Sequence, residues 1–394
     1  MKKHILISIG ILIFILVGTV LAVSYAKGYR FRFANGKPEL SGTGLLVATS
    51  TPNGASVLVN DRLLTATDNT ITLLPGTYEV KIAKEGYLPW KKTIVVKKEE
   101  VSKIKALLFP TAPKLESITA AGVENPLLDP SETRIAYAVS SQSAQRNGLY
   151  VLDMTTHPIL TLQSGITHII DDTVDQFSRA QFTWSADGKD LIATSSSAFG
   201  SPVTYLLEAD VFNQNPRRVS EPKSLDALFL IWQEEQEKKE QARLNSLKRS
   251  LRTIIADYFD IVAWSPDETK ILYHASTSAT LPLIIEPHLF GANSTPEKRT
   301  IEKGQIYAYD IKEDRNYAVP PTPLMWFPDS EHLMYVYDKR IDIMEYDGLN
   351  RTTIYAGPFI DNYVFPYPNG SKILILTNLN NPNIPPNLYT IGLK

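Results

Sequence analysis

Residues 264–273 begin with the turn sequence Trp264-Ser265-Pro266-Asp267 and continue into the apolar segment Ile271-Leu272-Tyr273. The same order, a turn built on Pro-Asp, Ala-Asp or Pro-Asn followed by a strand that looks buried, occurs five times in the chain. The other copies are Asp129-Pro130-Ser131-Glu132, Trp184-Ser185-Ala186-Asp187-Gly188, Trp326-Phe327-Pro328-Asp329 and Tyr367-Pro368-Asn369-Gly370. Such repetition is typical of folds that place copies of one supersecondary unit side by side.

The spacing of the copies predicts a β-propeller of about five blades over residues 115–394. A second strand follows in each copy, and in four copies it ends in Asp, as in Leu149–Asp153 and Ile306–Asp310. Outer strands are expected at 159–162, 317–319 and 353–355. The last copy lacks one, so residues 115–119 are expected to pair there and close the ring, which removes an exposed sheet edge.

The intervals between copies are uneven, although a four-stranded blade needs only about 40–45 residues. The excess predicts two insertions. The first, about 224–257, is helical because Leu244, Leu247, Leu251 and Ile254 recur at steps of three and four residues. The second, about 276–303, contains three prolines and is expected to be a long loop.

The repeated turns resemble the WD40-like repeats of TolB-type propellers, most clearly at Trp264-Ser265-Pro266-Asp267 and next at Trp184-Ser185-Ala186-Asp187-Gly188. This resemblance implies the fold and says almost nothing about function. The repeated Trp and Asp side chains could contact a ligand. A packing or turn role, the same in every blade, accounts for the repetition more simply.

Residues 44–110 predict a separate small β-domain. Segments 45–49, 55–59, 70–73, 78–82 and 92–96 are predicted strands, and several alternate apolar and polar residues. The motifs between them, Thr51-Pro52-Asn53-Gly54-Ala55, Leu74-Pro75-Gly76-Thr77-Tyr78 and Glu85-Gly86-Tyr87, resemble the PEGA domain. That resemblance implies a β-sandwich module associated with cell-surface and envelope proteins, and it implies no catalytic residue.

The N-terminal segment 1–26 predicts a transmembrane anchor, followed by a linker over 27–43. No charged residue occurs from Ile5 to Ala26, and a helix of that length spans about 33 Å, enough for the hydrocarbon core. Lys2 and Lys3 favour a cytoplasmic N-terminus, although the basic residues after the segment weaken that preference. A cleaved signal peptide is the alternative, since Ser24-Tyr25-Ala26 resembles a cleavage site.

The amino-acid composition limits the kinds of binding and catalytic site that the chain can form. The net charge of −2 gives no footprint for nucleic acid, and the absence of cysteine excludes disulfides and thiolate metal sites. No nucleophile elbow, phosphate-binding glycine loop or His-Glu-x-x-His motif is present. A metal or acid–base site at His168 with Asp171, Asp172 and Asp175 is conceivable, but a polar loop fits that spacing better. We therefore expect no catalytic residue, no metal and no cofactor.

These observations predict a mainly β, single-pass membrane protein with most of its chain outside the cytoplasm. The propeller would serve as a recognition scaffold for an envelope protein or a glycan. One alternative is an extracytoplasmic propeller hydrolase acting on peptide or glycan, with carboxylates contributed by several blades. Another is a structural component of the cell envelope.

Overall fold

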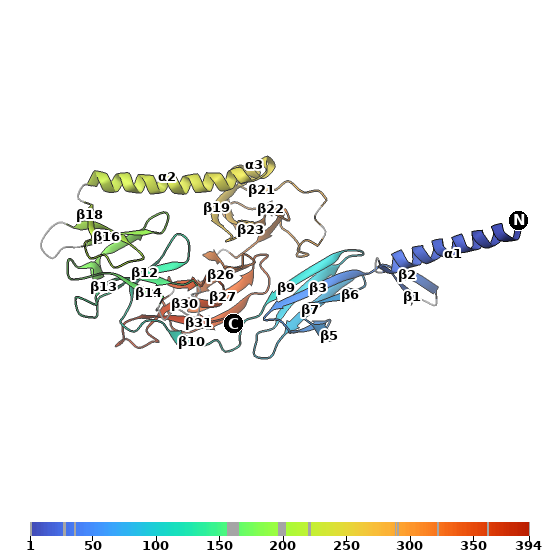
Figure 1. The fold of residues 1–394 in the computed structure, drawn as a ribbon, viewed down its shortest axis with the longest axis horizontal. Coiled ribbons are helices and arrows are strands. Elements are labelled where there is room, and N and C mark those ends of the chain that lie inside the picture. Colours follow the sequence, from blue (N-terminus) through green and yellow to red (C-terminus); the bar gives the residue numbers. More distant parts are fainter. Residues whose placement is uncertain are drawn as a thin grey trace. The chain divides into compact units, whose positions relative to one another are not determined.

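The computed structural model describes residues 2–26, 29–34, 37–155, 165–195, 202–219, 222–287, 289, 291–320, 323–360 and 362–393. The chain divides into two compact units, and Figure 1 shows its helices and strands in sequence colours. The first unit comprises Met1–Thr111, Pro282–Arg299 and Tyr309–Ala318. The second comprises Ala112–Leu281, Thr300–Ala308 and Val319–Lys394. Strands dominate both units, as the sequence predicted.

The first unit begins with helix α1, Lys2–Ala26, whose large apolar side chains from Ile9 to Tyr25 are exposed. Among the residues described, no helix combines the length and the apolar character needed to cross a membrane. Strands β1 (Arg30–Ala34) and β2 (Lys37–Ser41) follow as an antiparallel pair. The segment 27–43 is therefore more than the predicted linker. Its alternation Arg30-Phe31-Arg32-Phe33 is a strand pattern that the sequence prediction overlooked.

A sandwich of two sheets forms the rest of the N-terminal domain. One sheet has the order β6-β3-β9 and the other β5-β4-β7-β8. The strands are β3 Gly44–Thr51, β4 Ser56–Val59, β5 Arg62–Ala66, β6 Asn69–Leu73, β7 Gly76–Ala83, β8 Trp90–Val96 and β9 Val101–Leu107. Their inward side chains form one apolar cluster, which includes Leu46, Val57, Ile82 and Trp90. All five predicted strands are present, whereas β5 and β9 are additional.

Five four-stranded antiparallel sheets form the propeller within the described residues, in agreement with the predicted blade number. Blade 1 contains β11 Glu124–Leu128, β12 Arg134–Val139, β13 Gly148–Asp153 and β14 Ile166–Asp171. Blade 2 contains β15 Gln181–Trp184, β16 Asp190–Ser195, β17 Val203–Glu208 and β18 Arg217–Val219. The short 3-10 helix η1, Phe177–Arg179, precedes blade 2.

The remaining blades repeat this order of strands. Blade 3 contains β19 Phe259–Trp264, β20 Lys270–Ala275, β23 Ile306–Asp310 and β24 Arg315–Ala318. Blade 4 contains β25 Leu324–Trp326, β26 His332–Tyr337, β27 Arg340–Glu345 and β28 Thr352–Ala356. Blade 5 contains β29 Val364–Pro366, β30 Lys372–Thr377, β31 Asn387–Gly392 and β10 Leu115–Ser117.

The strand β10 confirms the predicted closure of the ring. Leu115 lies opposite Ile391 and Ser117 opposite Tyr389, so an early segment supplies the outer strand of the last blade. The outer strands predicted at 317–319 and 353–355 are also present, as β24 and β28. The strand predicted at 159–162 lies outside the described residues, and the outer strand of blade 1 is β14.

The five repeated turns have one shared backbone geometry. In each turn the amide of the fourth residue donates to the carbonyl of the first, at 2.8–3.1 Å. That fourth residue has positive φ in every copy: Glu132 57°, Gly188 72°, Glu268 57°, Ser330 60° and Gly370 63°. Only two copies use glycine, which adopts this conformation without steric cost, so the turn holds non-glycine residues in the left-handed region as well.

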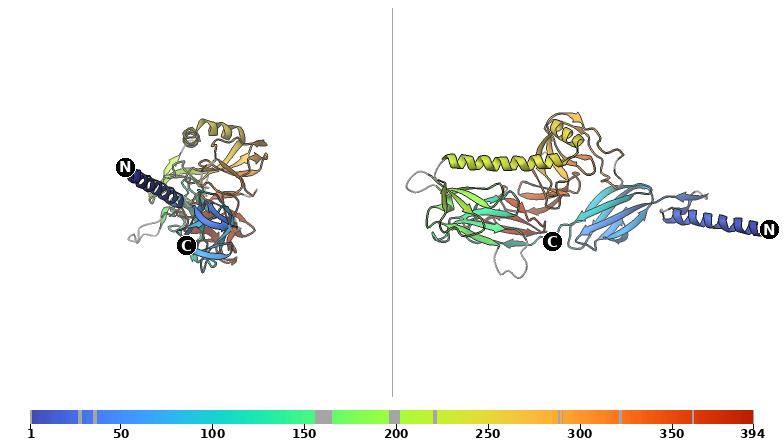
Figure 2. Two further views of the ribbon diagram at one scale, coloured as in Figure 1. Left: turned by 90° about the vertical axis from the view of Figure 1, so that its right-hand side faces the viewer. Right: turned by 45° about the horizontal axis from the view of Figure 1, so that its top comes forward.

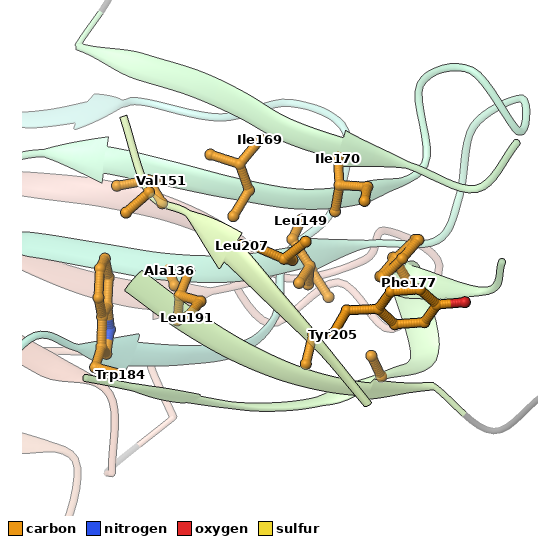
Figure 3. Close-up of a cluster of buried hydrophobic side chains, with 14 residues drawn as sticks. Ala136, Leu149, Val151, Ile169, Ile170, Phe177, Trp184, Leu191, Tyr205 and Leu207 are labelled. Carbon is orange, nitrogen blue, oxygen red and sulfur yellow. The ribbon is translucent and has the colours of Figure 1, made fainter. Parts of the chain in front are cut away.

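Apolar side chains also pack between neighbouring blades. Figure 3 shows the cluster shared by blades 1 and 2, in which Leu149 and Val151 meet Trp184, Leu191 and Leu207. Burial of side chains of this size contributes roughly 1.5–3 kcal/mol each. A second cluster joins Ile135 and Tyr137 of blade 1 to Leu374 and Leu388 of blade 5. The core therefore lies between the sheets.

Both insertions occur where the spacing predicted them. The helical insertion consists of α2 (Pro222–Ser246) and α3 (Arg249–Tyr258), and the right-hand view of Figure 2 shows the long helix followed by the short one. One continuous helical stripe was expected, but the extended ψ of 145° at Lys248 separates the helices. Leu251, Ile254 and Ile255 of α3 are buried. In the second insertion, β21 (Ala279–Thr280) pairs with β22 (Thr300–Ile301), so it is not a loop throughout.

Candidate functional site

His168 lies in strand β14 and packs against aromatic rings. The His168 ring stacks on Tyr150 with centroids 4.2 Å apart and meets the edge of Phe212 at 5.4 Å. Asp172 accepts from the Ser178 amide and hydroxyl, and Asp175 accepts from Ser195 and Tyr205. These carboxylates therefore hold η1 and blade 2 in place. The expected polar loop is present only at Asp172 and Asp175, because His168 and Asp171 belong to β14. Within the described residues no group of three or more His, Asp or Glu is arranged to hold a metal ion.

A second histidine, His332 in blade 4, is buried beside a carboxylate. Its Nδ1 lies 2.7 Å from Oδ2 of Asp329. Burial alone would lower the pKa of His332, but the hydrogen bond and charge of Asp329 outweigh it, so the pKa of His332 is raised. The same pairing overcomes burial to lower the pKa of Asp329. A buried imidazole that pairs with a carboxylate of its own turn favours a structural role over general-base chemistry.

The repeated tryptophans join consecutive blades through matching hydrogen bonds. Trp184 of blade 2 donates from Nε1 to the Leu127 carbonyl of blade 1 at 3.0 Å. Trp326 of blade 4 donates to the Ala263 carbonyl of blade 3 at 3.3 Å. Leu127 and Ala263 occupy equivalent positions, each two residues before the first residue of its turn. The packing role that repetition predicted is therefore confirmed for these two tryptophans.

Trp264, the third tryptophan of the series, departs from this pattern. Its Nε1 donates to Oε1 of Glu240 on α2, at 2.9 Å. The equivalent partner in the preceding blade would have been the carbonyl of Thr183. The helical insertion thus takes the place of blade 2 as the partner of Trp264. Two neighbouring contacts of α2 accompany it: Lys239 donates to the Ala186 carbonyl at 3.4 Å, and Arg243 pairs with Glu268 at 2.7 Å.

The second residue after each repeated turn also changes at blade 2. In blades 1 and 3 it is a cation that reaches the next blade. Arg134 lies 5.3 Å from the Trp184 ring and pairs with Asp210, and Lys270 pairs with Glu331 at 3.3 Å. In blade 2 the equivalent residue is Asp190. Burial, together with the charges of Asp187 and Glu208, raises the pKa of Asp190. Blade 2 therefore lacks the cation that blades 1 and 3 offer to the blade that follows.

Helix α2 also exposes three consecutive large apolar side chains. Phe229, Leu230 and Ile231 are 42%, 57% and 52% exposed, and the Phe229 ring meets Trp232 edge to face at 5.7 Å. Further along α2, a groove is lined by polar and small residues: Glu234, Glu237, Lys238, Gln241, Ala242 and Asn245. Figure 1 shows α2 running along the propeller unit from the end of β18 toward α3 and β19.

The fold and this surface define a PEGA-type sandwich followed by a propeller that carries an apolar helical insertion. Residues 43–111 match the family model described as the PEGA domain, which confirms the resemblance drawn from the sequence. No curated protein matches the chain.

Solved structures similar to the chain include two TolB proteins. One, from Agrobacterium tumefaciens, shares 13% identity over 73% of each chain, with a TM-score of 0.21. The other, from Acinetobacter baumannii, shares 13% identity over 91% of this chain and 66% of its own, with a TM-score of 0.22. An acylaminoacyl peptidase from Pyrococcus horikoshii shares 11% identity over 69% of this chain and 39% of its own, with a TM-score of 0.20.

Proposed function

We propose that this protein is a non-catalytic recognition scaffold of the cell envelope, anchored to the membrane by its N-terminal segment. The uncharged stretch Ile5–Ala26 supports the anchor, because insertion of so many apolar residues into a bilayer is favourable. The PEGA domain supports the envelope location by analogy with the proteins that carry it. In this proposal most of the chain lies outside the cytoplasm.

The observation that carries the recognition role is the apolar surface of α2, formed by Phe229, Leu230 and Ile231. Exposed apolar side chains are costly for a monomer to leave in water, and they favour a protein partner over a glycan. This surface lies in the insertion, where the repeat is interrupted, whereas the repeated turns serve the propeller itself. We therefore place recognition on the insertion, toward another envelope protein with an apolar contact patch.

Site-specific photo-crosslinking in native membranes tests the recognition role. A photoreactive residue at Leu230 and, separately, at Ile231 should capture the same protein, identified by mass spectrometry. The matched control is Gln236, which is exposed on the opposite side of the same helix from Leu230 and Ile231, and it should not capture that protein. The proposal requires the reciprocal experiment to succeed as well, with the captured protein crosslinking back to α2. Unrelated proteins from the two apolar sites would contradict it.

The anchor and the location are tested separately. Protease added to intact cells should degrade residues 27–394, and alkaline extraction should leave the intact chain with the membrane fraction. Full protection from the protease would place the folded part in the cytoplasm. Release of a chain that starts after Ala26 would identify the N-terminal segment as a cleaved signal.

A further inference from the structure

The junction between blades 2 and 3 is joined differently from its neighbours. Between blades 1 and 2, Trp184 bonds directly to Leu127 and Arg134 donates to the carbonyl of Gly188. Between blades 3 and 4, Trp326 bonds to Ala263, and the Asp267 amide donates to Ser330 at 3.0 Å. Each of these junctions therefore has at least two hydrogen bonds that run directly from one blade to the next.

Three side chains of α2 replace such direct bonds at the junction of blades 2 and 3. Lys239 reaches the repeated turn of blade 2 at the Ala186 carbonyl. Glu240 and Arg243 reach the repeated turn of blade 3, at Trp264 and Glu268. Arg243 also lies 3.7 Å from Glu240, so the two contacts with blade 3 are linked through one ion pair. Arg243 lies three positions from Glu240 and four from Lys239, spacings at which side chains are neighbours on a helix surface, so one side of α2 spans both turns.

Within the described residues, blades 2 and 3 do not use the groups that join blade 1 to blade 2 and blade 3 to blade 4. Nε1 of Trp264 donates to α2. Blade 2 has Asp190 at the position where blades 1 and 3 have a cation. A carboxylate there has no favourable interaction with the carbonyls or carboxylates that Arg134 and Lys270 contact at the other junctions. The sequence of blade 2 is therefore suited to a neighbour that supplies its own cations, as α2 does through Lys239 and Arg243.

From this arrangement we propose that the junction of blades 2 and 3 is a seam in the ring, and that α2 and α3 form a latch across it. Displacement of the three α2 contacts opens the ring at this junction while the other junctions stay closed. The contacts at the protein surface are polar, and such contacts contribute about 1 kcal/mol each, so a partner that engages α2 can release them. The seam depends on geometry alone and is independent of the proposed recognition role.

Hydrogen–deuterium exchange on the full-length protein tests the seam. Trp264→Phe removes the bond between Trp264 and α2 while largely preserving side-chain size. Glu240→Gln keeps an acceptor for Trp264 but removes the negative charge that strengthens this bond and pairs with Arg243. Both variants should fold and should raise exchange in β15, β19 and α3, by about fivefold for Trp264→Phe, which corresponds to a loss of about 1 kcal/mol of local stability, and by a smaller factor for Glu240→Gln. Exchange in β12, β26 and β30 should stay within about twofold of the parent protein.

Two matched variants decide the outcome. Trp326→Phe removes the equivalent tryptophan bond at a junction that keeps a direct bond between blades, so its effect should be several times smaller. Glu235→Gln changes an exposed α2 carboxylate outside the latch and should change nothing. Equal effects of Trp264→Phe and Trp326→Phe would overturn the proposal, because the junctions would then be equivalent. The proposal would also be overturned if hydrogen–deuterium exchange rose equally in all five blades or did not rise in any of them.

Discussion

Replacement of Asp129 by alanine should destabilise the propeller. The equivalent residue in blade 3, Ser265, suggests a second variant that should restore the lost stability. The Asp129 side chain is fully buried and accepts from the amides of Thr133 and Arg134, at 2.7 and 2.8 Å. In blade 3 the hydroxyl of Ser265, at the equivalent position, accepts from the matching amides of Thr269 and Lys270. Serine at position 129 should therefore restore the bonds that alanine removes.

The expected loss of stability follows from the two backbone amides that would lose their acceptor. Each buried donor left without an acceptor costs about 1–3 kcal/mol, so Asp129→Ala should lose about 2–6 kcal/mol in total. At about 2 °C per kcal/mol for a domain of this size, the melting temperature should fall by about 4–12 °C. Asp129→Ser should recover at least half of that loss, because its neutral hydroxyl forms weaker bonds than a carboxylate.

Urea unfolding followed by tryptophan fluorescence measures these differences. Four of the five tryptophans, at 184, 232, 264 and 326, lie in the second unit and report on the propeller. The dependence of the unfolding free energy on urea should be the same in all three proteins, so that the midpoints compare directly. If Asp129→Ala lies within about 0.5 kcal/mol of the parent, or if serine is no better than alanine, then the turn bonds do not stabilise this blade as argued.

Three further outcomes follow from particular contacts. Leu207→Ala, at a fully buried position of the cluster between blades 1 and 2, should cost about 2–5 kcal/mol in urea unfolding. Asp314 accepts from the amides of Ile284 and Ile285 at 2.6 and 2.8 Å, so Asp314→Asn should make the loop at 282–287 a preferred protease site, whereas the exposed Asp338→Asn should not. The raised pKa of His332 means that its pairing stabilises the fold below about pH 6.5 and is lost as pH rises through the folded-state pKa. The pKa of Asp329 is lowered, so the contribution of Asp329 to stability is present above about pH 3.8 and is lost on acidification. Urea midpoints from about pH 5 to about pH 9 should therefore fall toward alkaline pH in the parent and more weakly in His332→Gln, and parallel profiles would contradict this assignment.

Local sequence patterns are sufficient to predict most of the propeller. The five turns are recognisable because proline, aspartate and glycine each favour the backbone conformations that the turn requires. The unpaired last copy was sufficient to predict that residues 115–119 complete the last blade, because an open blade leaves unsatisfied hydrogen-bonding groups; the register, with Leu115 opposite Ile391, comes from the structure. The helical insertion was visible because the buried residues of α3, such as Leu251 and Ile255, recur at helical spacing.

Features that depend on distant neighbours were missed. Strand β9 was not predicted: it pairs in parallel with β3, and its buried Ile104 lies between the exposed Lys103 and Lys105. The partner of Trp264 was unpredictable from its turn alone, because Glu240 lies on another element. One signal was available: Asp190 stands where the other four copies have Arg134, Lys270, His332 and Lys372. Comparison of equivalent positions would have marked that junction as different.

The pairing of β10 with β31 also sets the order of events during synthesis. Leu115 leaves the ribosome early, but its partner Ile391 belongs to the last strand of the propeller to be made. Blades 1 to 4 consist of neighbouring segments and can assemble as they emerge, whereas blade 5 must wait for a contact of very large sequence separation. The nascent chain therefore exposes an unpaired sheet edge until β31, Asn387–Gly392, has been made.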